Sequence, residues 1–95
     1  MSGKIDGTIV AINTCGDLVT DITAQQLEFA PRDERVRIEC DEHETNGIFA
    51  PGHQQPESTF LALIDADGRL ALQIVGLSAS ELLGIRVGQP VTVQW

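Results

Sequence analysis

The sequence predicts one small, mainly β domain: a closed or partly open antiparallel barrel of about six to seven strands with two short helices. Short apolar runs rich in β-branched residues recur between turn signals along the chain. Two of these turns contain the Gly-Asp or Asp-Gly pairs that favour hairpins, and capping patterns mark two helix starts. A length of 95 residues suffices for one core, so we expect a single domain over residues 1–95.

The first hairpin is predicted over residues 7–23. Its first strand, expected over residues 4–13, has apolar residues on both faces from Ile9 to Ile12, which favours a strand covered on both sides. The chain then turns at Cys15-Gly16-Asp17, where a glycine can adopt positive φ, and returns along residues 17–22.

Two segments have the form of a capping box and predict short helices. Thr23 and Gln26 have this spacing, as do Ser78 and Glu81. The second helix is expected to end at Gly84, because glycine readily adopts the left-handed cap. The first helix is expected to pack through two apolar residues, Leu27 and Phe29.

The middle of the chain alternates and then becomes irregular. Residues 34–40 place apolar and charged side chains on opposite faces, which predicts a half-buried strand. Residues 41–56 predict a short strand at 47–50 followed by a surface loop, in which His53 is expected to be solvated.

The last third of the chain predicts a second hairpin and a closing strand. Residues 58–64 and 69–75 are two apolar runs joined through Asp67-Gly68, a strong local hairpin signal. A last strand is expected over residues 91–95.

The charge balance excludes several classes of partner. Fourteen acidic and six basic residues give a net charge of −8, and no cluster of Lys and Arg offsets it locally. We therefore expect no nucleic acid and no anionic membrane surface as partner, and interpret the acidity as serving solubility, with a cationic ligand or basic partner as the alternative. The N-terminal residues resemble no signal peptide and no run could span a membrane, so the sequence predicts a cytoplasmic protein.

No catalytic or metal-binding set emerges from the motifs. Cys15 and Cys40 occur in no CxxC pattern, which favours reduced thiols over a disulfide or zinc site. Residues 40–44 and His53 include metal-ligand types but lack a close-spaced motif, so we expect no metal. The sequence contains no nucleophile elbow and no phosphate-binding loop, and enzymatic activity by the chain alone is not expected.

Four segments resemble a known family. Residues 7–13 resemble its strand G-x-V-x-x-x-D, and residues 15–22 (CGDLVTDI) resemble its F-G-N-L-V-T-N-I. Residues 77–84 (LSASELLG) and 87–93 (VGQPVTV) resemble its closing G-S-A-A-E-L-L-G and x-x-G-D-x-V-x-V. The chain is similar in these segments to the C-terminal β-barrel of the S-adenosylmethionine (SAM) hydroxide adenosyltransferases, the family that includes the chlorinases and fluorinases.

The resemblance implies a ligand site as well as a fold. In the family the barrel follows an α/β domain, and the active site lies between that domain of one subunit and the barrel of its neighbour in a trimer. The barrel contributes mainly to the adenine end. The aromatic residue that walls the base falls on Cys15, and the Asn that hydrogen-bonds the base edge falls on Asp17. An ionised Asp offers acceptors only, and loss of stacking removes about 1–3 kcal/mol per base. The implied ligand-binding set is Cys15, Asp17, Thr20, Val75 and Ser78.

Three functional hypotheses follow. Because the chain begins at the barrel and both base-contact positions differ, the first is a stand-alone, non-catalytic binding or interaction module, with self-association as one form of it. The second is a barrel subunit that completes a shared adenosyltransferase site with a separate α/β chain. The third is a generic small-ligand barrel of the kind found in molybdate-binding domains. No resident cofactor is expected, and SAM or adenosine is the ligand that the resemblance implies.

Overall fold

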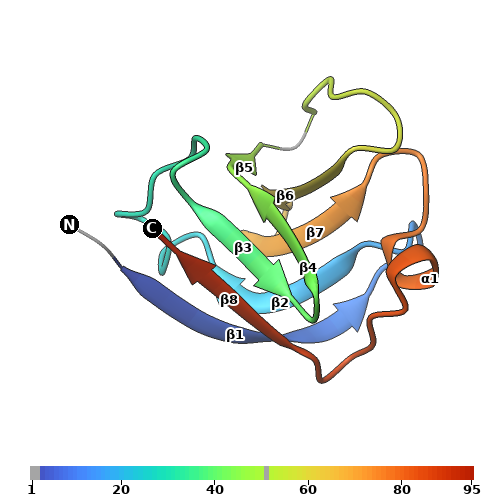
Figure 1. Cartoon of the computed structure of the whole chain (residues 1–95), viewed down its shortest axis with the longest axis horizontal. Coiled ribbons are helices and arrows are strands. Elements are labelled where there is room, and N and C mark those ends of the chain that lie inside the picture. Colours follow the sequence, from blue (N-terminus) through green and yellow to red (C-terminus); the bar gives the residue numbers. More distant parts are fainter. Residues whose placement is uncertain (1–2, 51) are drawn as a thin grey trace.

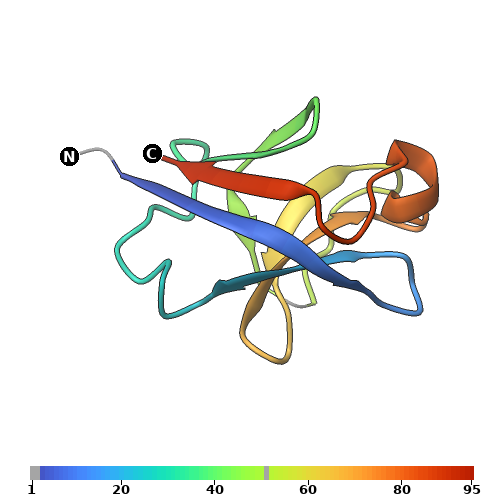
Figure 2. The ribbon, with the colours of Figure 1, turned by 90° about the horizontal axis from the view of Figure 1, so that it is seen from below.

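The computed structural model describes residues 3–50 and 52–95, and it confirms the mainly β barrel. Within these residues, eight strands form one sheet in the order β4-β3-β8-β1-β2-β7-β6-β5, with a single short helix at one end (Figures 1 and 2). The strand count is slightly higher than the six to seven predicted. The elements are β1 Lys4–Ile12, β2 Leu18–Thr23, β3 Arg37–Cys40, β4 His43–Asn46, β5 Ile48–Phe49, β6 Phe60–Ile64, β7 Arg69–Ile74, α1 Ala79–Leu83 and β8 Pro90–Gln94.

Strand β1 joins the two halves of the barrel. Its first half pairs with β8, from Lys4 opposite Gln94 onward, and its second half pairs with β2 after an irregularity in register between Ile9 and Ala11. The expectation that β1 is covered on both sides is wrong. Ile9 is buried, whereas Val10 and Ile12 face solvent.

The barrel is nearly closed by a strand that changes partners at Gly47. Strand β4 pairs with β3, whereas β5, directly after Gly47, pairs with β6 in parallel. Gly47 has a φ of 86°, which allows this change of direction. The Thr45 hydroxyl also donates to the Phe60 carbonyl oxygen at 3.0 Å, which ties β4 to β6. The barrel is therefore not purely antiparallel.

The first of the two predicted helices is absent. Its capping box does form, because the Thr23 N–H donates to Gln26 Oε1 at 2.9 Å and the Gln26 N–H donates to Thr23 Oγ1 at 3.2 Å. The segment then continues as hydrogen-bonded turns, since Pro31 follows too soon for a helix to extend. Leu27 is buried as expected, but Phe29 is 89% exposed.

The second predicted helix is confirmed as α1. Ser78 Oγ accepts the Glu81 N–H at 3.2 Å, and Gly84 ends the helix with a φ of 68°. The helix buries Ala79 against the barrel. No helix of the described residues is long and apolar enough to cross a membrane.

The core fills the barrel with aliphatic side chains. Its largest fully buried members are Ile9, Leu18, Ile22, Leu27, Val36, Ile38, Leu70, Leu72, Ile85, Val91 and Val93. A second, smaller cluster lies on the outer face of β6 and β7. It consists of Leu61, Leu63 and Ala71, with Phe49 and Val75 packed against it. Alternate residues of β7 therefore face two apolar environments, which leaves little room for polar side chains on this strand.

Candidate functional site

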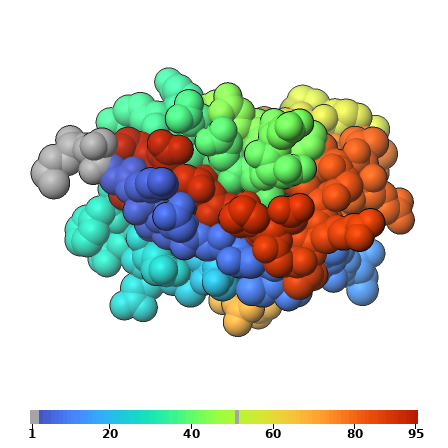
Figure 3. Space-filling model, turned by 60° about the horizontal axis from the view of Figure 1, so that its bottom comes forward, coloured from blue at the N-terminus to red at the C-terminus, as the bar shows by residue number. Residues whose placement is uncertain are grey.

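A groove of about 380 Å³ lies at the end of the barrel that carries α1. The loop after β1 and the segment around α1 meet there (Figures 1 and 3). Its lining consists of Cys15, Asp17, Gln73, Ile74, Gly76, Leu77 and Ser78. Three of the predicted ligand-binding residues, Cys15, Asp17 and Ser78, are thus brought together, and Thr20 and Val75 are not part of the lining.

Asn13 shapes the loop that carries Cys15 and Asp17. Its Oδ1 accepts the backbone N–H groups of Cys15 at 2.9 Å and of Asp17 at 3.0 Å, and its Nδ2 donates to Asp17 Oδ2 at 3.2 Å. One amide therefore fixes both the loop backbone and the Asp17 carboxylate. The sequence reasoning did not single out Asn13, although an Asn just after an apolar strand is a turn signal.

Gly16 locks this loop to the start of α1. Its carbonyl oxygen accepts the Ser80 N–H at 2.9 Å, and its φ of 85° lies in the left-handed region. A Cβ at this position would collide with Oγ and Cβ of Ser78 and approach the Ser78 Cα at 2.8 Å. The two walls of the groove are therefore held together at a contact that only glycine permits.

Asp17 places a carboxylate in the lining of the groove. The residue is 9% exposed, and Thr20 is the other buried polar residue among those described. The ion pairs of the described residues are Arg35 with Asp33 and Arg37 with Glu44, so none reaches Asp17. A buried carboxylate without a cation is unfavourable unless donors compensate it. Asn13 supplies one side-chain donor, and Asp17 is part of the groove lining.

Thr20 and Val75 have structural surroundings. The Thr20 hydroxyl donates to the Leu70 carbonyl oxygen at 2.7 Å and accepts the Ile22 N–H at 3.1 Å, and the residue is fully buried. Val75 packs its side chain against the outer cluster, and its backbone bonds to the segment that precedes β6. Neither side chain reaches the groove, so a ligand-binding role for these two residues remains only a prediction.

Gln73 lines the groove and was missed by the sequence reasoning. It is the one polar residue inside the apolar run LALQIV, and that interruption was an available signal. Because Leu18 lies opposite Leu72 in the β2–β7 register, the next pair outward places Asp17 opposite Gln73. Both side chains therefore lie on the groove side of the strands while their leucine neighbours enter the core.

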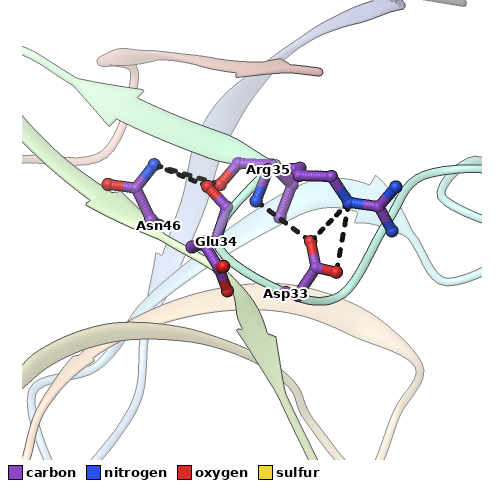
Figure 4. Close-up of polar contacts among 5 residues, drawn as sticks. Asp33, Glu34, Arg35 and Asn46 are labelled. Atoms are coloured by element: carbon purple, nitrogen blue, oxygen red, sulfur yellow. Dashed lines mark hydrogen bonds and ion pairs between the residues drawn. The ribbon is translucent and has the colours of Figure 1, made fainter.

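A second groove, of about 320 Å³, lies at the opposite end and is lined by Arg35, Arg37, Asn46, Gln94 and Trp95. Figure 4 shows Arg35 Nε donating to both carboxylate oxygens of Asp33, at 2.9 and 3.1 Å. This hydrogen bond holds the pKa of Asp33 below its usual value and raises the pKa of Arg35. Arg37 lies 3.8 Å from Glu44, so both guanidinium groups of this groove already have acidic partners.

The cysteines and histidines form no metal-binding cluster. In residues 3–50 and 52–95, no three His, Cys, Asp or Glu side chains converge as a metal site requires. Burial, and secondarily the nearby Asp41, raises the pKa of the Cys40 thiol to about 11, whereas Cys15 is exposed at the groove. His53, expected to be a solvated loop residue, is half-buried in its loop: Nε2 lies 2.8 Å from Gln73 Oε1 and the ring packs 5.8 Å from that of Phe49.

Comparison with known structures supports the fold. An uncharacterized conserved protein from Thermotoga maritima matches 95% of this chain at 20% identity, with a TM-score of 0.73. A conserved hypothetical protein from Thermus thermophilus matches 93% at 17% identity, with a TM-score of 0.71. This chain spans 35% and 32% of the lengths of those two chains. A search of curated proteins gave no match.

The family assignment comes from the sequence profile of one domain. The profile of the SAM hydroxide adenosyltransferase C-terminal domain matches residues 7–92. This interval contains the barrel strands from the middle of β1 into β8 and the whole lining of the groove. The chain therefore belongs to the SAM hydroxide adenosyltransferase C-terminal domain family.

Proposed function

We propose that the chain is a non-catalytic small-molecule-binding module whose ligand places an N–H donor or a positive charge beside Asp17. The observation that carries this proposal is the buried Asp17 carboxylate on the groove wall, which has no cationic partner among the described residues. A donor on the ligand would add a charge-assisted hydrogen bond to a carboxylate whose one side-chain donor among the described residues is Asn13.

The family assignment supports SAM and adenosine as the first ligands to test. Adenosine carries an exocyclic amino group, and SAM adds an ammonium and a sulfonium charge. Cys15 lacks the aromatic surface that would stack on a base, so we expect weak binding, in the micromolar to millimolar range.

An NMR titration of the ¹⁵N-labelled chain with adenosine, SAM and methionine tests the proposal. We expect saturable shifts confined to residues 16–20 and 74–79 with adenosine and SAM, and smaller ones with methionine. The matched variant Asp17→Asn keeps the size of the side chain, removes its charge and adds an N–H donor, so it should weaken the binding of cationic SAM relative to that of neutral adenosine. The absence of shifts in both segments at saturating ligand would contradict the proposal.

The non-catalytic part of the proposal has its own test. The groove brings together a thiol, a carboxylate, an amide and a capping hydroxyl, and among the described residues the carboxylate is hydrogen-bonded to Asn13 rather than to the thiol or the hydroxyl. Purified chain incubated with SAM should release no adenosine above the rate in buffer. Turnover by the chain alone would overturn this part and leave ligand binding intact.

A barrel subunit for a separate α/β chain is the second candidate function. It is favoured by the share of the solved structures that this chain spans, about one third of each. Leu77, on the groove wall, and Leu82, on the adjoining helix, are also exposed apolar residues that a second chain would cover. Co-purification from native extract should then recover an α/β chain that restores adenosine release from SAM when it is mixed with the barrel. Recovery of no such chain would contradict this candidate.

Self-association is the remaining way to cover exposed apolar surface. Phe29 and Leu82 are 89% and 62% exposed, whereas Trp95 and Phe49 are half-buried. Light scattering on the purified chain distinguishes a monomer of 10.3 kDa from an oligomer.

A further inference from the structure

The Gln73 side chain is hydrogen-bonded to His53, and a second contact of that histidine defines its tautomer. His53 Nε2 lies 2.8 Å from Gln73 Oε1, and the Gln55 N–H donates to His53 Nδ1 at 3.3 Å. A backbone N–H can only donate, so Nδ1 must present its lone pair. In a neutral imidazole the proton is then on Nε2, and Nε2–H donates to Gln73 Oε1.

This contact determines what Gln73 presents on its other side. With Oε1 engaged by His53, the NH₂ group is at the opposite side of the amide plane. No hydrogen bond to that NH₂ is formed within the described residues, and none of their buried side-chain nitrogen or oxygen atoms lacks a partner. The NH₂ group is therefore open to solvent, in a residue that lines the groove.

Asp17, just before β2, and Gln73, in β7, carry complementary polar groups. The β2–β7 register pairs Leu18 with Leu72, and extending it by one residue brings Asp17 opposite Gln73, a position where Cβ atoms are typically about 5 Å apart. Their side chains form no mutual hydrogen bond in the described structure, where Asp17 Oδ2 is bonded to Asn13 and Gln73 Oε1 to His53. The groove lining thus includes one residue with a carboxylate acceptor and one with an amide donor.

We propose that Gln73 is a specificity-determining, ligand-contacting residue of the groove and that His53 is its positioning residue. The pair of Asp17 and Gln73 selects a ligand with an acceptor and an N–H donor on neighbouring atoms, as in a carboxamide or the N=C–NH₂ edge of an aminated ring. The donor that an aspartate cannot offer is supplied by Gln73 from the opposite strand. This inference rests on the proposed function, because it assigns chemistry to the same groove.

Three probes of the same size separate the possibilities: benzamide has a donor and an acceptor, benzamidinium has donors only, and benzoate has acceptors only. We expect the wild-type chain to bind benzamide and benzamidinium and to reject benzoate. Gln73→Glu replaces the donor by a second carboxylate, so the affinity for benzamide should fall about fivefold, which is the effect of one hydrogen bond. The affinity for benzamidinium should rise. Gln94→Glu, which adds the same charge in the other groove, should leave the ratio of the two affinities unchanged.

The positioning role of His53 has a separate readout. His53→Ala lets the Gln73 amide turn its oxygen toward the groove, so the ratio of the benzamide and benzamidinium affinities should shift in favour of benzamidinium. If the substitution only loosened the loop, both affinities would fall alike. In the Gln73→Glu background, His53→Ala should shift the ratio no further. If wild type binds benzamidinium but Gln73→Glu leaves the ratio unchanged, this proposal is overturned and the Asp17 groove stands. If no probe binds the wild type, this proposal is overturned, and the titration with adenosine and SAM decides the proposed function separately.

Discussion

The contact between Gly16 and Ser78 makes Gly16→Ala the most informative stability variant. An alanine would adopt a left-handed φ of 85°, which costs an L-residue about 1–2 kcal/mol. Its Cβ would also meet Ser78, including the Cα at 2.8 Å, which no side-chain rotation relieves. We expect this overpacking to add about 1–3 kcal/mol, for a total loss of roughly 2–4 kcal/mol after the gain from a stiffer unfolded chain.

Gly68 provides the matched control. Its φ is 77°, its N–H and carbonyl oxygen are both hydrogen-bonded as they are in Gly16, and nothing lies within 4 Å of its virtual Cβ. Gly68→Ala therefore carries the backbone cost without the collision. Urea unfolding, followed by the fluorescence of Trp95 and by circular dichroism, gives both free energies of unfolding. Equal losses in the two variants would refute the idea that α1 is locked onto the loop.

Three further predictions concern the buried and exposed side chains around the barrel. Thr20→Val removes the hydroxyl that bonds the Leu70 carbonyl and the Ile22 N–H, so the free energy of unfolding measured in urea should fall by about 1–3 kcal/mol. Thr20→Ser keeps the hydroxyl and should lose less than half of that. Equal losses in the two variants would contradict the role of the hydroxyl. In native protein Cys15 should react with a thiol reagent at once and Cys40 only after unfolding, and a ligand in the groove should slow the reaction of Cys15. Rapid reaction of Cys40 in the native protein would be inconsistent with its burial. Because burial raises the pKa of Cys40 from 9.0 to about 11, the folded state holds this proton more tightly, so a stabilisation of about 2–3 kcal/mol is complete below pH 9 and is lost as pH rises through 11. Cys40→Ala should abolish that part of the pH dependence.

Strands with local signals could be predicted from the sequence, and strands made by tertiary context could not. The alternation of residues 34–40 and the Asp67-Gly68 turn led to β3, β6 and β7 because those patterns act within a few residues. Strand β4 has the sequence HETN, with no apolar residue, and it forms because β3 on one side and Phe60 on the other provide its partners. Its turn relies on Asp41 at a φ of 58°, which the sequence does not announce.

In the candidate site too, residues with local sequence signals could be predicted and residues placed by tertiary contacts could not. Cys15, Asp17 and Ser78 were identified because a turn, a capping box and a family resemblance all point to them. Gln73 and His53 were missed because their contact joins a strand to a loop twenty residues away in sequence. Phe29 was assigned to a helix face that does not exist, since the proline two residues later stops the segment at turns.

The central claim is that the groove beside Asp17 is the place where a small molecule binds, and intermolecular nuclear Overhauser effects test it most directly. With adenosine at saturation, we predict effects between ligand protons and the side chains of Cys15 and Leu77, which line that groove. Effects to Trp95 in the other groove, or none at all, would contradict the claim.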